Sequence, residues 1–202
     1  MERYLARVIL VVLHPLLITT LGVLLLFNSE FYLSVASSEM KMVILACAFL
    51  GTTILPLAAI AIHKILTAKK GPVPDRMLKT TYYLFTALCY YLSFQAISNV
   101  ALAGFFKAVF LSGALVLVIM ALITLRWPVS EYTTAAGALL GMVMALMLRL
   151  GSGAYGHLFG LIALGGLTGY AVLCLEKNNP AQVYAGYLLG FIVLFLIFSF
   201  IG

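Results

Sequence analysis

The sequence predicts an all-α fold, a polytopic bundle of about six to seven transmembrane helices that forms a single domain over residues 1–202. Of the 202 residues, 64% are hydrophobic and 9% are charged, whereas a soluble domain is about half apolar and about a quarter charged. The apolar residues form runs of about 20, the length that crosses a bilayer as a helix. Glycine and proline are scattered through these runs, as membrane helices tolerate. This composition excludes a water-soluble enzyme, a disordered segment and a nucleic-acid-binding module.

Seven apolar stretches are long enough to span, and short charged connections separate them. The first stretch contains His14-Pro15 and is too long for a signal peptide, with no clear small-residue cleavage site after it. Asn99 and Lys107 bracket a tight turn between the third and fourth stretches, so this hairpin has a shorter alternative of less than two full spans. The stretches are residues 8–27, 42–66, 81–98, 102–125, 131–148, 155–175 and 183–201.

The last three stretches are rich in small residues one helical turn apart. Such pairs let helix backbones approach closely in lipid, where no hydrophobic force joins helices. Four pairs within three helices of one chain predict packing inside the chain, and homodimerisation is the alternative. The pairs are Gly137/Gly141, Gly156/Gly160, Gly165/Gly169 and Gly186/Gly190.

The basic residues are distributed unequally between the two predicted sides. Seven spans place the chain termini on opposite sides, with nine basic residues on the amino-terminal side and three on the other. Because short cytoplasmic loops carry the excess of Lys and Arg, we expect a cytoplasmic amino terminus. The nine are Arg3, Arg7, Lys64, Lys69, Lys70, Arg76, Lys79, Arg126 and Lys177, and the three are Lys41, Lys107 and Arg149.

Three connections on the amino-terminal side combine basic residues with hydroxyl or amide groups. Because all three fall on one face of the predicted bundle, they can converge on one pocket. Lys and Arg beside hydroxyls and amides suit a phosphate or another anion. The alternative is a basic collar at the level of the lipid headgroups. The connections are residues 69–79, 126–134 and 176–182.

These connections resemble, in order, the three signature segments of the type 2 phosphatidic acid phosphatase (PAP2) superfamily. The first family segment is Lys, six residues, Arg-Pro, and Lys69 and Arg76 have this spacing, with Met77 in place of Pro. The second is Pro-Ser-Gly-His, and the chain has Val129-Ser130-Glu131-Tyr132.

The third family segment is Ser-Arg, five residues, His, three residues, Asp. Here the corresponding residues are Ala171-Val172, Asn178 and Gln182. Two further stretches, His14-Pro15-Leu16-Leu17 and Leu55-Pro56-Leu57, resemble a bacterial branch of the superfamily. The likeness covers nearly the whole chain, and residues 179–186 carry its most specific match.

The resemblance implies a phosphate site that has lost its catalytic groups. It implies phosphate ligands at Lys69, Arg76 and Ser130. The family's second arginine, its acid His, its nucleophilic His and the Asp that orients that His are replaced by Val172, Tyr132, Asn178 and Gln182 respectively. An amide nitrogen has no available lone pair to attack phosphorus, and Tyr132 is a poor acid at neutral pH. Glu131 adds a negative charge that repels phosphate unless it points away.

We therefore expect no catalytic residue, and hydrolysis by the family's route is predicted to be absent. No His, Cys, Asp or Glu set has the spacing of a metal site, and no cofactor is expected. His63, near the first connection, is considered as a replacement nucleophile, with an interfacial histidine as the alternative.

Three functions stay open: a non-catalytic lipid-binding or partner protein, an active lipid phosphatase with altered chemistry, and a small transporter unrelated to phosphate. The expected partners are membrane lipids, either a phospholipid or a polyprenyl phosphate, or another membrane protein, but not nucleic acid. The expected location is the bacterial inner membrane. Charge bias puts the pocket at the cytoplasmic face, whereas the resemblance implies the outer face.

Overall fold

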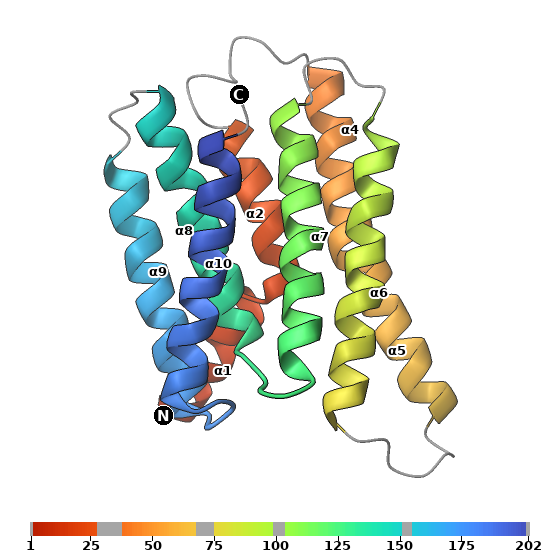
Figure 1. Ribbon diagram of the computed structural model, residues 1–202, viewed down its shortest axis with the longest axis vertical. Helices are drawn as coiled ribbons and strands as arrows, with labels where there is room; N and C mark the ends of the chain where they lie inside the picture. The colour runs from red at the N-terminus through yellow and green to blue at the C-terminus, as the bar shows by residue number, and fades with distance from the viewer. Residues whose placement is uncertain (1, 28–37, 68–74, 99–103, 151–154, 201–202) are drawn as a thin grey trace. The chain divides into compact units, whose positions relative to one another are not determined.

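The computed structural model describes residues 2–27, 38–67, 75–98, 104–150 and 155–200, and all regular structure in them is helical (Figure 1). Five helices in these ranges are long and apolar enough to cross a membrane, or six if one bent pair forms a single span. The predicted helical class is confirmed for these residues, and their apolar helices fit a membrane protein, whereas a count of six to seven spans stays a prediction. The five are Ser38–His63, Gly104–Thr124, Glu131–Arg149, Tyr155–Cys174 and Pro180–Phe200.

The helix that covers the predicted third span is not among these five. Helix α6 (Asp75–Ala96) has 22 residues, long enough to cross a bilayer, but it is less apolar than the other long helices. Its first turns carry charged side chains, and tyrosines, threonines, a serine and a glutamine follow. The shorter alternative for the hairpin around residue 100 is not seen, because Asp75–Ala96 has 22 residues and Gly104–Thr124 has 21.

The chain divides into two compact units. Unit 1 consists of Met1–Ile18 and Val129–Gly202, and unit 2 consists of Thr19–Pro128. Each unit is described by itself, and the single domain expected over residues 1–202 stays a prediction. Unit 1 holds α1 (Glu2–Val12), the start of α2 (Pro15–Phe27), α8 (Glu131–Leu150), α9 (Tyr155–Cys174) and α10 (Pro180–Phe200).

Glycines bring the backbones of α8 and α10 into contact in unit 1. A Cβ atom added at Gly137 would overlap the carbonyl oxygen of Tyr187, and one added at Gly190 would overlap that of Thr134. The pairs Gly137/Gly141 and Gly186/Gly190 thus pack within the chain, as predicted, and Gly165/Gly169 faces the side chains of Tyr187 and Val183 in α10. Gly156 and Gly160 have no described atom within 4 Å of an added Cβ, so this pair does not serve the α8–α10 contact.

The first predicted span is broken at His14-Pro15. Helices α1 and α2 meet at an angle of 57°. Proline has no N–H to donate and clashes with the preceding turn, so α1 ends before it, and Pro15 takes the first helical position of α2. The side chain of His14 caps the new helix, since its Nδ1 accepts a hydrogen bond from the Leu16 N–H at 3.4 Å.

Unit 2 is built around a buried tyrosine. The ring of Tyr90 fills the space that Gly113 leaves in α7, where an added Cβ would lie 2.5 Å from the ring. The Tyr90 hydroxyl bonds to Thr19 and Thr52, and Thr52 donates to the Ala48 carbonyl at 2.7 Å. This chain of hydroxyls satisfies polar groups that would be costly to bury alone. The helices of unit 2 are most of α2, then α4 (Ser38–Phe49), the π-helix η1 (Leu50–Ile54), α5 (Leu55–Thr67), α6, and α7 (Gly104–Thr124).

Candidate functional site: a polar cluster at one end of unit 1

The ends of three helices meet at one end of unit 1. Helices α8, α9 and α10 alternate in direction (Figure 1), so the start of α8, the end of α9 and the start of α10 lie at the same end. Side chains and backbone from the second and third signature segments are hydrogen-bonded to each other there. We call this set the polar cluster, and it consists of His14, Ser130, Glu131, Tyr132, Lys177, Asn178 and Gln182.

Ser130 is the residue just before α8. Its backbone N–H donates to the Gln182 carbonyl at 3.3 Å, which ties the second segment to the third. Its carbonyl accepts hydrogen bonds from the hydroxyls of Thr133 and Thr134. The Ser130 side chain is 1% exposed, yet its Oγ has no hydrogen-bond partner within the described residues. Buried hydroxyls are normally paired, so an unpaired one at this position is unusual.

Lys177 meets Tyr132 through an unusual helix end. The N–H groups of Glu176 and Lys177 return to the carbonyls of Leu173 and Val172, which is the Schellman pattern that ends many helices. The position that favours glycine is taken by Glu176 at φ 54°, a conformation that non-glycine residues rarely adopt. The turn brings Lys177 Nζ to 3.1 Å from the Tyr132 hydroxyl and 4.5 Å from its ring centroid. The cation thus has both a hydrogen bond and a cation–π contact.

Gln182 and Asn178 are bonded to each other at the start of α10. Gln182 Oε1 accepts from the Asn178 side-chain amide at 3.1 Å and from the Asn179 N–H at 3.0 Å. The second bond is half of a capping box, in which the side chain of the third helical residue accepts a hydrogen bond from the N–H of the residue that precedes the helix. The two positions where the PAP2 resemblance expects nucleophile and orienting carboxylate are therefore joined as an amide pair that also caps the helix.

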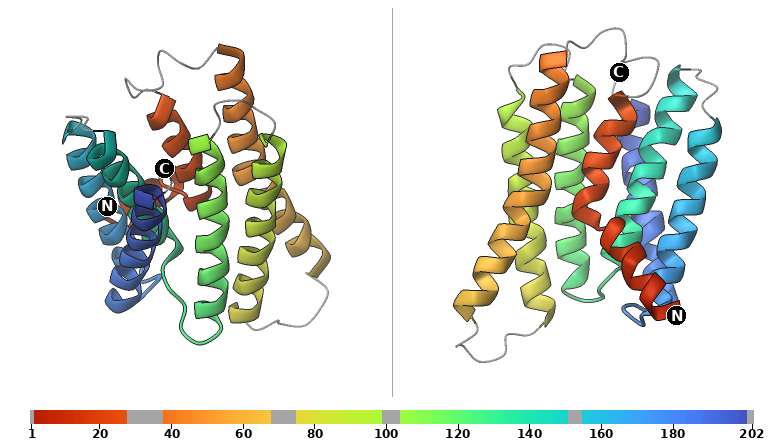
Figure 2. Two further views of the ribbon diagram at one scale, coloured as in Figure 1. Left: turned by 45° about the horizontal axis from the view of Figure 1, so that its top comes forward. Right: turned by 180° about the vertical axis from the view of Figure 1, so that it is seen from behind.

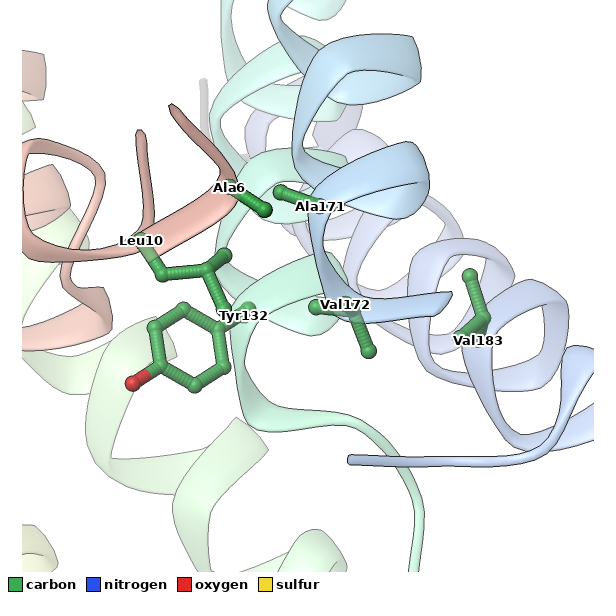
Figure 3. Packing of buried hydrophobic residues seen from close by; sticks show 6 residues of the cluster. All are labelled: Ala6, Leu10, Tyr132, Ala171, Val172 and Val183. Atoms are coloured by element: carbon green, nitrogen blue, oxygen red, sulfur yellow. The ribbon is translucent and has the colours of Figure 1, made fainter. Parts of the chain in front are cut away.

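Val172 lies in an apolar cluster rather than at an anion site (Figure 3). Its side chain is 0% exposed, and it packs with residues of α1 and with the terminal turns of α8, α9 and α10. The position where the resemblance expects a second phosphate-binding arginine has thus become part of the core. The members of this apolar cluster are Ala6, Leu10, Tyr132, Ala171, Val172 and Val183.

His14 and Glu131 complete the polar cluster. The His14 ring stands edge-on to the Tyr132 ring, with centroids 5.9 Å apart, and it lies within electrostatic range of Glu131 and Lys177. Glu131 opens α8, where the helix dipole favours a carboxylate. The negative charge that we expected to oppose phosphate therefore stands beside the helix N-terminus and the imidazole.

The first signature segment belongs to unit 2. Lys69 lies outside the described residues. Arg76 is exposed in the first turn of α6 and donates to the Arg126 carbonyl at 3.4 Å, so a role for either residue in phosphate binding stays a prediction. His63 also lies in unit 2, where its Nδ1 is 3.2 Å from the Tyr82 hydroxyl.

Sequence reasoning placed Lys177 in the third connection without assigning it a role in the site, and it missed His14. Lys177 is the basic residue nearest in sequence to Asn178, and His14 precedes the proline that breaks the first span. Both signals were present in the sequence. However, the contact of each residue with Tyr132 depends on helix packing between segments more than 40 residues apart.

Among the described residues, no group of three His, Cys, Asp or Glu side chains is placed to hold a metal ion. No protein-family model, no curated protein and no solved structure matches the chain. The PAP2 resemblance therefore continues to rest on motif order and spacing alone.

Proposed function

We propose that the chain is a PAP2-like membrane protein that binds the phosphate headgroup of a lipid at the polar cluster and does not hydrolyse it by the family's route. The observation that carries the proposal is Lys177 held against Tyr132, with the unpaired hydroxyl of Ser130 two residues from that tyrosine. The ligand class is a phospholipid or a polyprenyl phosphate.

The donors of the polar cluster match the needs of a phosphate group. Phosphate oxygens accept several hydrogen bonds and favour charged donors. Lys177 supplies a point charge with three donors, and the hydroxyls of Tyr132 and Ser130 supply two more. In this proposal Lys177 takes the place of the phosphate-binding arginine that the resemblance expects at position 172. Lys177 reaches the cluster from the loop after α9 instead of from the helix itself.

The amide pair supports binding without turnover. Asn178 uses its side-chain N–H to bond Gln182, and an amide nitrogen is not a nucleophile toward phosphorus. No carboxylate orients it, because Gln182 stands in that place. Loss of a positioned general acid or base alone costs about a hundredfold or more, and here the nucleophile, its orienting group and the acid are all replaced.

His14 is the imidazole that an altered mechanism would have to use. Its Nδ1 accepts the Leu16 N–H, so the uncharged ring carries its proton on Nε2. In that state neither nitrogen has a free lone pair for attack on phosphorus, while the Nε2–H can donate to a phosphate oxygen. This arrangement favours ligand binding over a phosphohistidine intermediate.

Replacing Lys177 by glutamine is expected to weaken binding of phosphatidic acid by about tenfold to a hundredfold, because a charged hydrogen bond contributes about 1.5–3 kcal/mol. Calorimetric titration of a short-chain phosphatidic acid into the purified protein in detergent measures the change. Lys79→Gln removes the same charge from an exposed residue of α6 and is the matched control. Ser130→Ala is expected to weaken binding while leaving thermal stability unchanged or slightly higher, because the lost hydroxyl is unpaired.

Equal affinity in Lys177→Gln, Lys79→Gln and the parent protein would contradict the proposed site. Phosphate release from phosphatidic acid, phosphatidylglycerol phosphate or polyprenyl pyrophosphate that disappears in Ser130→Ala or Arg76→Ala would show an active phosphatase instead. Weaker binding in Lys69→Ala and Arg76→Ala would extend the site to the first signature segment. The absence of any lipid dependence would favour the transporter hypothesis.

For orientation, we propose that the chain lies in the bacterial inner membrane with its amino terminus and polar cluster at the cytoplasmic face. The nine-to-three charge asymmetry supports this. Because α8, α9 and α10 alternate in direction, α10 ends opposite the polar cluster in unit 1. A reporter enzyme fused after Gly202 is expected to be active only outside the cytoplasm, and activity only inside would contradict the orientation.

A further inference from the structure

We propose that α1 is an interfacial helix, which lies along the membrane surface and docks on anionic lipid headgroups instead of forming the first part of a transmembrane span. The exposed face of α1 is distinct from the polar cluster, and the inference does not rest on the function proposed above.

The buried side chains of α1 contact the ends of three helices of unit 1. Ala6 and Leu10 pack against the last turn of α9, the first turn of α8 and the first turn of α10 (Figure 3). Arg3 reaches Glu176, in the loop that follows α9, at 3.4 Å. A helix that ran down into the bilayer beside α9 would contact successively deeper turns. In the view from behind, α1 runs obliquely across these helix ends instead of parallel to α9 (Figure 2).

The outer face of α1 is apolar and uncovered. Tyr4 is 72% exposed, Val8 44% and Val11 69%, and their spacing of four and three residues places them on one side of the helix. Leu5 and Val12 widen this face. In water such a face would be unfavourable, whereas in the headgroup region its side chains reach the acyl chains.

The charges of α1 fit an anionic surface. Arg3 and Arg7 are four residues apart on the border between the buried face and the apolar face, and both are exposed. The pair of Arg3 with Glu176 is itself exposed on both sides, so water and headgroups compete with it easily. A basic flank beside an apolar face is typical of helices that bind in the plane of anionic membranes.

The break after α1 allows the helix to leave the direction of α2. The 57° bend falls at His14-Pro15, where the His14 cap satisfies an N–H of the new helix. With only 11 residues, α1 is about 16 Å long. That length suits an element that lies on the surface.

The depth of α1 in the bilayer tests the proposal directly. The chain has a single tryptophan, so Trp127→Phe provides a background free of tryptophan. In that background Tyr4→Trp, Val8→Trp and Val11→Trp are made one at a time. Each protein is reconstituted in vesicles that contain lipids brominated at different positions along the acyl chain, and quenching reports the depth of each indole.

Equal depth at positions 4, 8 and 11 is the expected result. A transmembrane α1 would separate positions 4 and 11 by about 10 Å in depth, and such a gradient would overturn the proposal. Arg3→Gln combined with Arg7→Gln is expected to abolish any difference in quenching between vesicles with and without phosphatidylglycerol, whereas Arg149→Gln, at the other end of α8, should preserve it. If the tryptophan variants that keep Arg3 and Arg7 are quenched equally with and without phosphatidylglycerol, the proposal that α1 binds anionic lipids is contradicted. Lys177→Gln should leave all three depths unchanged, which separates this result from the lipid-binding test.

Discussion

Replacing Val172 by arginine is expected to destabilise the protein strongly and not to restore a phosphate ligand. The Val172 side chain is 0% exposed and packs among apolar residues of α1, α8 and α10. A guanidinium placed there would lose its hydration without a carboxylate in the apolar cluster to pair with it. An unpaired buried charge costs about 3–5 kcal/mol. The thermal unfolding midpoint and the yield of monodisperse protein in detergent measure the loss.

The matched control for this substitution is Ala181→Arg. Ala181 is exposed in the first turn of α10, at the same end of unit 1, so the added arginine can keep its water. We expect this variant to fold like the parent. If Val172→Arg had parent-like stability and bound phosphatidic acid more tightly, position 172 would be an open anion site and the packing described for it would be wrong.

Replacing Gly190 by alanine is expected to lower the stability of unit 1 by about 1–3 kcal/mol, the usual cost of overpacking a close contact. The new methyl group would overlap the carbonyl oxygen of Thr134 and approach the Ala138 nitrogen at 2.8 Å. Both are backbone atoms of α8, which cannot turn away as a flexible side chain can. Gly137→Ala meets the Tyr187 backbone from the other helix and should act in the same direction.

Gly160→Ala separates this steric effect from the ordinary effect of alanine in a helix. No described atom lies within 4 Å of a Cβ added at Gly160. The substitution should therefore leave stability unchanged or raise it by up to about 1 kcal/mol. Thermal unfolding of the variants in one detergent compares them. A larger loss in Gly160→Ala than in Gly190→Ala would point to a homodimer built on α9, which was the alternative for these glycine pairs.

Under the proposed function, the small side chain at Val172 links the missing phosphate ligand to the placement of α1. Ala6 and Leu10 can lie over the ends of α8, α9 and α10 because no long cation projects from position 172. In this proposal the anion is bound by Lys177, which approaches Tyr132 from the following loop. Under the proposed function, valine at position 172 both removes a phosphate ligand and leaves room for α1 to pack on the helix ends.

The sequence alone determined the helical class and the approximate position of most helices. Apolar runs of about 20 residues select helices, because a helix satisfies its backbone polar groups internally in lipid. The glycine pairs at 137/141 and 186/190 were also predicted as close contacts within the chain. The second and third signature segments were expected to meet, and Ser130, Tyr132, Asn178 and Gln182 do lie at one end of unit 1.

The tertiary structure decided which side chains became neighbours. It buried Val172, joined Asn178 to Gln182, and brought Lys177 and His14 to Tyr132. It also bent the chain by 57° between α1 and α2, within the stretch predicted as one span. Composition and periodicity are local properties, so they specify helices and their lengths. Contacts between residues 14, 132 and 177 depend on which helix faces pack together. That packing is set by the fit of side chains between helices throughout unit 1.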